Sequence, residues 1–159
     1  MNHTLINNHL HISFPDEFQF LTRDELQELY RSDNKDMWGI RDKAHKILLT
    51  VFHHKSSGFM VKVFGNPKEI AEQNERKLAA FYRDYGYERK EFFSSQINGK
   101  NAYGFRYVYT VQGIEQICES VVTFYKDTCY TFYYYTRPDL WEDNKPIYEE
   151  ILRSVQFQD

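Results

Sequence analysis

The segment from Glu88 to Tyr135 constrains the fold of this 159-residue chain more than any other, because its turns can be read directly. Runs of alternating aromatic and small or polar residues are separated by the dipeptides Asn98-Gly99, Gln112-Gly113 and Lys126-Asp127. Short turns of this kind connect the two strands of a β-hairpin. The pattern therefore predicts three or four consecutive antiparallel strands. The pairs that close the turns are expected to be Ile97 with Lys100, Val111 with Ile114, and Tyr125 with Thr128.

Helix signals flank these strands on both sides. Thr22 and Glu25 form a capping box ahead of a short helix, and Asn66 with Pro67 begins a second helix. A third helix near the C-terminus is expected to place Pro146 in its first turn, where the missing N–H is not needed. The apolar face of the second helix is expected to be Ile70, Leu78, Phe81, Tyr82 and Tyr85.

Other segments read as further strands. Leu10–Phe14 is expected to be an edge-type strand, and Ile47–Phe52 is a nearly continuous apolar run typical of a strand covered on both faces. Phe59–Phe64 is expected to be its hairpin partner. Val155 and Phe157 are expected to fold back as a terminal strand or as a plug. The fold class is therefore α+β, with an antiparallel sheet of about six to eight strands flanked by helices, in a single domain covering residues 1–159. A cone-shaped curved sheet with one covering helix is the alternative architecture.

Charge and hydropathy limit the partners. The formal net charge is −3 and the basic residues are spread along the chain, so we expect no nucleic-acid partner. Residues 1–14 lack the features of a signal peptide, and no run reaches the ~18 apolar residues of a membrane span. These features predict a cytoplasmic protein. The expected pairing places Cys118 and Cys129 on one sheet face but about 20 Å apart, too far for a disulfide, so both are expected to be reduced.

The hairpin register brings three charged residues together on one sheet face. Arg106 is expected to lie opposite Glu91 on one neighbouring strand and opposite Glu119 on the other. One interpretation is an anchor for an anion or a polar ligand, since an arginine can donate two hydrogen bonds to one partner. The other, which we favour, is a cross-strand charge ladder worth roughly 0.2–1 kcal/mol per pair.

The opposite sheet face is expected to carry a row of tyrosines. Tyr103, Tyr107 and Tyr109 alternate along one strand, with Phe105 between them. Each tyrosine combines an apolar ring with a polar tip, so an uncovered row could bind a peptide or an amphipathic ligand. Alternation alone also explains the row as a sheet face packed under a helix, and we favour this interpretation.

Catalytic signatures are absent from the sequence. There is no G-x-S-x-G, H-E-x-x-H, phosphate-binding or dinucleotide-binding motif. His9, His11 and His53 lack the clustered cysteines or carboxylates that usually accompany a metal site. We therefore expect no catalytic residue, no metal and no cofactor, and we predict that the protein is not an enzyme.

Two segments near the ends of the chain resemble a known family. The opening Ile12-Ser13-Phe14-Pro15-Asp16-Glu17-Phe18 and the closing run from Tyr148 to Phe157 are similar to those of the PsbP-like superfamily, as is the mid-chain helix leading into long antiparallel strands. The resemblance spans nearly the whole chain and implies an α/β/α sandwich. Characterised members mostly bind proteins or ions and seldom catalyse. No functional residue of the family has a recognisable counterpart here.

These observations predict a binding protein. The aromatic-rich sheet and the lack of a catalytic motif favour a protein-binding module, such as an adaptor or a chaperone for a partner protein. A small-molecule binder with an apolar, aromatic-lined cavity is the first alternative, and an enzyme without a recognisable motif is the second. The oligomeric state is left open.

Overall fold

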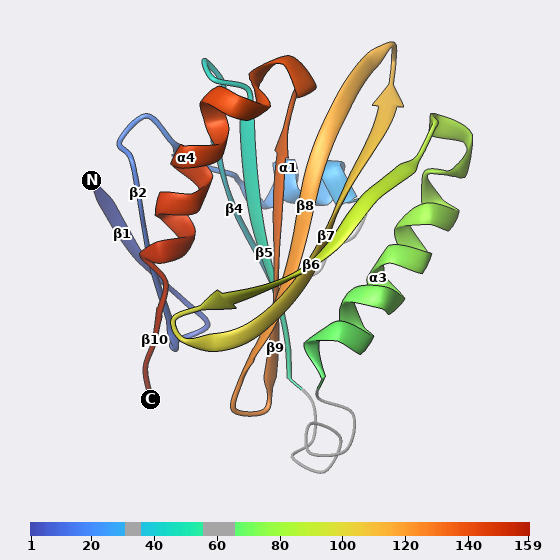
Figure 1. Ribbon diagram of the computed structural model, residues 1–159. Helices are drawn as coiled ribbons and strands as arrows, with labels where there is room; N and C mark the ends of the chain where they lie inside the picture. The colour runs from blue at the N-terminus through green and yellow to red at the C-terminus, as the bar shows by residue number, and fades with distance from the viewer. Residues whose placement is uncertain (31–35, 56–65) are drawn as a thin grey trace.

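The computed structural model describes residues 1–30, 36–55 and 66–159, and it shows an α/β/α sandwich (Figure 1). The strands of its large sheet are β3 (Gln19–Phe20), β4 (Met37–Asp42), β5 (Ile47–Lys55), β6 (Glu88–Ile97), β7 (Lys100–Val111), β8 (Ile114–Tyr125) and β9 (Thr128–Thr136). Their order across the sheet is β3-β4-β5-β9-β8-β7-β6, and all neighbours are antiparallel. The predicted α+β class and the expected size of the sheet are confirmed. The cone-shaped alternative is wrong, because helices cover both faces of this open sheet.

One face of the large sheet is covered by a helix and a second, smaller sheet. The helix is α4 (Trp141–Arg153), which follows the short 3-10 helix η2 (Pro138–Leu140). The small sheet pairs β1 (Asn2–Ile6), β2 (Leu10–Phe14) and β10 (Gln156–Phe157) in the order β1-β2-β10. We call this side the α4 face. Its core is fully buried and includes Leu10, Phe14, Leu49, Phe132 and Tyr148.

The opposite side, the α3 face, carries two separate helices. These are α1 (Arg23–Tyr30) and α3 (Pro67–Phe81), and α3 is followed by the 3-10 helix η1 (Arg83–Tyr85). The helix α3 packs on β7 and β8, whereas α1 packs on β4. Leu48 on β5 contacts the apolar residues under both helices. The two helices therefore share one sheet face and cover different parts of it.

The predicted hairpin registers are confirmed. The pairs Ile97–Lys100, Val111–Ile114 and Tyr125–Thr128 close the turns β6–β7, β7–β8 and β8–β9. Asn98, Gly99, Gln112, Gly113 and Lys126 have positive φ angles, as the tight turns require. Cys118 lies opposite Tyr135, and Cys129 lies opposite Phe124, so the two thiols are far apart and free, as expected.

Both predicted N-caps are present. The Thr22 hydroxyl accepts from the Glu25 N–H while the Glu25 carboxylate accepts from the Thr22 N–H, each at 3.1 Å. The Asn66 side chain accepts from the N–H of Lys68. These reciprocal and local bonds satisfy N–H groups that a helix leaves unpaired at its start.

Three expectations about element boundaries are wrong. Leu10–Phe14 is the central strand of the small sheet, because β1 and β10 pair with its two edges. Pro146 lies inside α4 rather than in its first turn, since that helix already begins at Trp141. Phe81 and Tyr85 are 64% and 45% exposed, because the α-helix ends at Phe81 and tightens into η1. The strand expected at Phe59–Phe64 lies outside the described residues.

Candidate functional site

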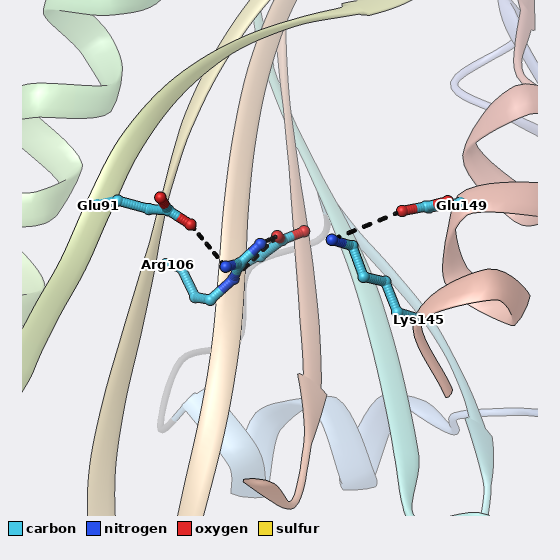
Figure 2. Close-up of polar contacts among 5 residues, drawn as sticks. Glu91, Arg106, Lys145 and Glu149 are labelled. Atoms are coloured by element: carbon cyan, nitrogen blue, oxygen red, sulfur yellow. Dashed lines mark hydrogen bonds and ion pairs between the residues drawn. The ribbon is translucent and has the colours of Figure 1, made fainter. Parts of the chain in front are cut away.

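The predicted charged triad forms on the α4 face with the expected partners. The Arg106 guanidinium donates from Nη1 to Glu91 Oε1 at 2.6 Å and from Nη2 to Glu119 Oε1 at 2.6 Å (Figure 2). Its Nε also donates to the same Glu119 oxygen at 3.2 Å. The guanidinium carbon Cζ of Arg106 lies over the ring of Trp141, 4.7 Å from its centroid. Arg106 is thus held by two strands and by the first residue of α4.

The charge of this triad favours a stabilising role. Two carboxylates surround one guanidinium, so an incoming anion would meet a net negative group. The Glu119 side chain is only 8% exposed, and burial raises the pKa of its carboxyl although the Arg106 hydrogen bond lowers it. Lys145 and Glu149 of α4 form a longer ion pair at 3.9 Å nearby (Figure 2). The anion-anchor hypothesis stays a prediction, and the geometry supports the charge-ladder interpretation.

The predicted tyrosine row lies on the α3 face, on the other side of the sheet from the triad. Tyr107 is fully buried beneath α3, and Tyr103 is half-buried against Phe92. Tyr109 stacks on Tyr82 of the α3 C-terminus, with ring centroids 4.0 Å apart. The structure therefore separates the predicted site residues into two groups. The middle of the row is covered, Tyr103 at one end stays half-buried, and Tyr109 at the other end lies at the edge of an opening.

That opening is a groove of about 900 Å³ between α1 and the C-terminal end of α3. Its remaining walls are the β4–β5 turn and the β7–β8 turn, which lie with the end of α3 at the upper end of the molecule in Figure 1. The sheet provides the floor, with Leu48 of β5, Tyr135 of β9 and Tyr109 of β7. The groove thus lies between the two helices, and Tyr82 at the end of α3 stacks on the floor residue Tyr109.

Tyrosine hydroxyls fix the floor of the groove. The Tyr30 hydroxyl, at the end of α1, lies 2.6 Å from the Thr50 hydroxyl and donates to the Tyr135 hydroxyl at 3.3 Å. Burial raises the pKa of the Tyr30, Tyr82 and Tyr109 hydroxyls. These groups are therefore protonated at neutral pH and act as neutral donors and acceptors.

The two ends of the groove differ in chemistry. At the α1 and β4–β5 end its lining is rich in charge: Glu25, Glu28, Arg41, Asp42, Lys43 and Lys46. At the α3 and β7–β8 end it is apolar and aromatic, with neutral polar side chains only at Gln112 and Gln116: Phe81, Tyr82, Tyr85, Tyr109, Val111 and Ile114. The groove thus has a charged half and an apolar half.

Exposed apolar side chains concentrate at this groove. Seven large hydrophobic residues are exposed within the described ranges, and four of them line it. These four are Leu29, Phe81, Tyr85 and Ile114. Single exposed hydrophobic residues are normal on a protein surface, but a cluster of them marks an interaction site.

Most of these groove residues are not predicted as site residues from the sequence. Phe81 and Tyr85 fall on the expected apolar face of a helix, and of the groove residues only Tyr109 is a predicted site candidate. The available signal was the density of aromatic residues just before Gly86, which exceeds what one short helix face can bury. The position of α1 beside α3 had no sequence signal, because it depends on how distant strands pair.

Other kinds of site find no support in the described part of the chain. No group of three or more His, Cys, Asp or Glu side chains there could hold a metal ion. Burial raises the pKa of the Cys118 thiol and raises that of Cys129 to about 11, so neither thiol is an activated nucleophile. None of the helices in these ranges has the length and apolar character needed to span a membrane.

Comparison with known proteins identifies the fold as PsbP-like. No protein-family model matches the chain, and a search of curated proteins found no match. Among solved structures, the cyanobacterial PsbP protein CyanoP from Synechocystis sp. PCC 6803 superposes with a TM-score of 0.67 at 13% identity, covering 94% of this chain and 86% of that one. The predicted resemblance to PsbP-like proteins is confirmed at the level of the fold.

Two further structures share the same architecture. A protein from Bacteroides thetaiotaomicron matches with a TM-score of 0.65 at 7% identity, covering 98% of this chain and 47% of that one. LpqN, involved in cell envelope biogenesis of Mycobacterium tuberculosis, matches with a TM-score of 0.54 at 12% identity, covering 94% and 83%. At such low identity the likeness concerns the fold alone, and function has to be argued from the site.

Proposed function

We propose that this protein is a protein-binding module that docks a polypeptide segment in the groove between α1 and α3. The observation that carries the proposal is the concentration of exposed apolar side chains at one concave site. Large aromatic side chains such as Phe81 and Tyr85 are well suited to anchor a partner, because they bury much area at little entropic cost. An adaptor or chaperone would use such a site.

We also propose that the protein acts by binding rather than by catalysis. General acids and bases work best when their pKa lies near the working pH. In the groove, burial raises the pKa of the tyrosine hydroxyls and the backbone hydrogen bond from Thr22 lowers the pKa of the Glu25 carboxyl, so all of these groups move further from neutrality. Glu119 is shifted toward neutrality, but Arg106 and α4 enclose it on the opposite face. A cytoplasmic location and the absence of nucleic-acid partners stay predictions, and the two free thiols are compatible with a reducing compartment.

The proposal is tested by selecting peptides from a random library displayed on phage, with the full-length protein as bait. Selected peptides should bind the variant Phe81→Ser/Ile114→Ser at least about tenfold more weakly, because two anchor contacts each worth over about 1 kcal/mol are removed. The variant Leu5→Ser is a matched control, since Leu5 and Ile114 are each 43% exposed and Leu5 lies away from the groove. Failure to enrich any peptide, or equal loss in both variants, would contradict the proposal.

A second candidate function is supported by the size of the groove. Its volume of about 900 Å³ falls in the range of small-molecule sites, and its apolar half is lined by aromatic rings. A thermal-shift screen against a metabolite library checks this candidate, because a ligand that binds the folded state raises the melting temperature. Stabilisation that the Phe81→Ser/Ile114→Ser variant abolishes would favour a small-molecule binder.

A further inference from the structure

Some charged side chains in the charged half of the groove have an ion-pair partner and others have none among the described residues. Arg41 is paired with Glu25, and Asp42 is paired with His45, whose Nδ1 lies 2.6 Å from the carboxylate. Glu28, Lys43 and Lys46 make no ion pair with any other described residue. The three acidic and three basic side chains of this lining sum to zero, but Lys43 and Lys46 place two ammonium groups at the β4–β5 turn that no carboxylate of the described residues contacts directly.

The two lysines come from one turn and face the same opening. Lys43 and Lys46 lie in the turn between β4 and β5, both are exposed, and the Lys46 N–H donates to the Lys43 carbonyl at 3.4 Å. Lys46 has a φ of 59°, as a tight turn requires, and both residues line the groove. A ligand that extends to this end from the apolar half meets the ammonium groups of both lysines.

The length of the groove indicates what kind of ligand fits. It extends across the sheet from Arg41 on β4 to Val111 on β7, which are separated by four strand spacings in the order β4-β5-β9-β8-β7. Four spacings of about 4.8 Å give roughly 19 Å, the length of about six extended residues. The apolar half is also open, since Phe81 remains 64% exposed. Sites for small molecules usually bury about 70–90% of the ligand surface. An open groove of this kind buries less of a small ligand, and this favours a longer occupant.

Resting on the function proposed above, we infer that the occupant of the groove is an extended polypeptide segment with apolar or aromatic residues at one end and carboxylates at the other. The apolar residues pack on Phe81, Tyr85 and Ile114, and the carboxylates pair with Lys43 and Lys46. The rim charges contribute specificity and association rate more than total affinity. The same arrangement disfavours segments whose basic residues would face the two lysines.

The composition of selected phage peptides tests this inference directly. Peptides enriched on the full-length protein should carry Asp or Glu at one end of an apolar core. A labelled selected peptide should bind Lys43→Glu/Lys46→Glu about tenfold more weakly by fluorescence anisotropy, because two attractions become repulsions. The control Arg76→Glu/Lys77→Glu makes the same change in net charge on exposed residues of α3 outside the groove, and should change the affinity by less than about twofold.

The outcomes separate this inference from the function on which it rests. Peptides that need Phe81 and Ile114 but show no acidic preference, or that bind Lys43→Glu/Lys46→Glu normally, would overturn the charge inference and leave the docking function intact. Failure to enrich any peptide would overturn both. Decanoate serves as a probe for a small amphiphilic anion. If it occupied the groove more tightly than the selected peptide, the polypeptide assignment would be wrong.

Discussion

Arg106 is enclosed on three sides, and this explains what its removal should do. Its guanidinium contacts Glu91, Glu119 and the ring of Trp141, and its side chain is 19% exposed. Of the two carboxylates, Glu119 is buried and Glu91 is half-exposed. The important partner is therefore Glu119, which would lose its compensating charge while remaining beneath α4.

We expect Arg106→Ala to lower the free energy of unfolding by about 2–4 kcal/mol, because it leaves a buried carboxylate unpaired. Lys90→Ala is the control, since Lys90 forms an exposed ion pair with Glu88 and should cost no more than about 0.5 kcal/mol. Urea denaturation measures both values. A peptide selected on the groove should bind native Arg106→Ala normally, because the triad lies on the opposite face. Normal stability combined with lost binding would contradict the charge-ladder interpretation.

At the scale of strands and helices, the sequence predicted what turn chemistry and alternation control. Asn98-Gly99 and Gln112-Gly113 specify tight turns, so the pairing of Arg106 with Glu91 and Glu119 could be worked out before any coordinates. It missed β1, although the Asn7-Asn8 turn that joins β1 to β2 has positive φ angles and is itself a local hairpin signal. It could not predict how α1 and α3 are placed on the sheet, because this depends on contacts between distant segments. The groove belongs to this second kind of feature. Its walls come from α1, two turns and α3, which have no common local signal.

Gly104 provides a test of how closely neighbouring strands pack. A Cβ at this position would lie 2.4 Å from the Ser120 carbonyl oxygen and 3.0 Å from Phe93, which covers the glycine as expected from the register. Since backbone cannot move aside cheaply, Gly104→Ala should lower the free energy of unfolding by about 2–3 kcal/mol.

Gly39→Ala is the matched control for this prediction. The added Cβ would approach Leu21 Cδ1 at 2.7 Å, the mobile end of a side chain. A side chain can change rotamer more readily than a backbone carbonyl can shift, so the cost should stay below about 1.5 kcal/mol. Equal losses for the two variants in thermal and urea melts would show that the backbone near Gly104 yields as easily as a leucine side chain.

At the scale of the whole molecule, the two sides of the large sheet differ in how fully they are covered. The α4 face is closed by a helix and a small sheet, whose last strand brings the C-terminal segment back onto β2. The α3 face carries two helices that leave a groove between them. The charged triad and the groove thus lie on opposite sides of the large sheet. This arrangement lets the surface on the α3 face vary without disturbing the packing beneath α4.

The two cysteines can report whether the molecule opens as one unit. Cys118 on β8 and Cys129 on β9 lie in the interior of the large sheet, packed in the apolar cluster beneath α3. Strands in such positions usually exchange only through global unfolding. In native protein both thiols should therefore resist a thiol reagent, and in increasing urea both should become labelled at rates that follow global unfolding.

Labelling of the single variants Cys118→Ala and Cys129→Ala assigns each rate to one thiol. Raising the pH to about 9 should not by itself make Cys129 react quickly with the reagent. The pKa of its thiol is raised to about 11, so the reactive thiolate stays scarce in the folded state. Fast labelling of Cys129 while Cys118 stays protected would contradict a single cooperative unit. It would mean that the sheet opens near the β8–β9 turn while the region of Cys118, which contacts Tyr109 on the groove floor, stays folded.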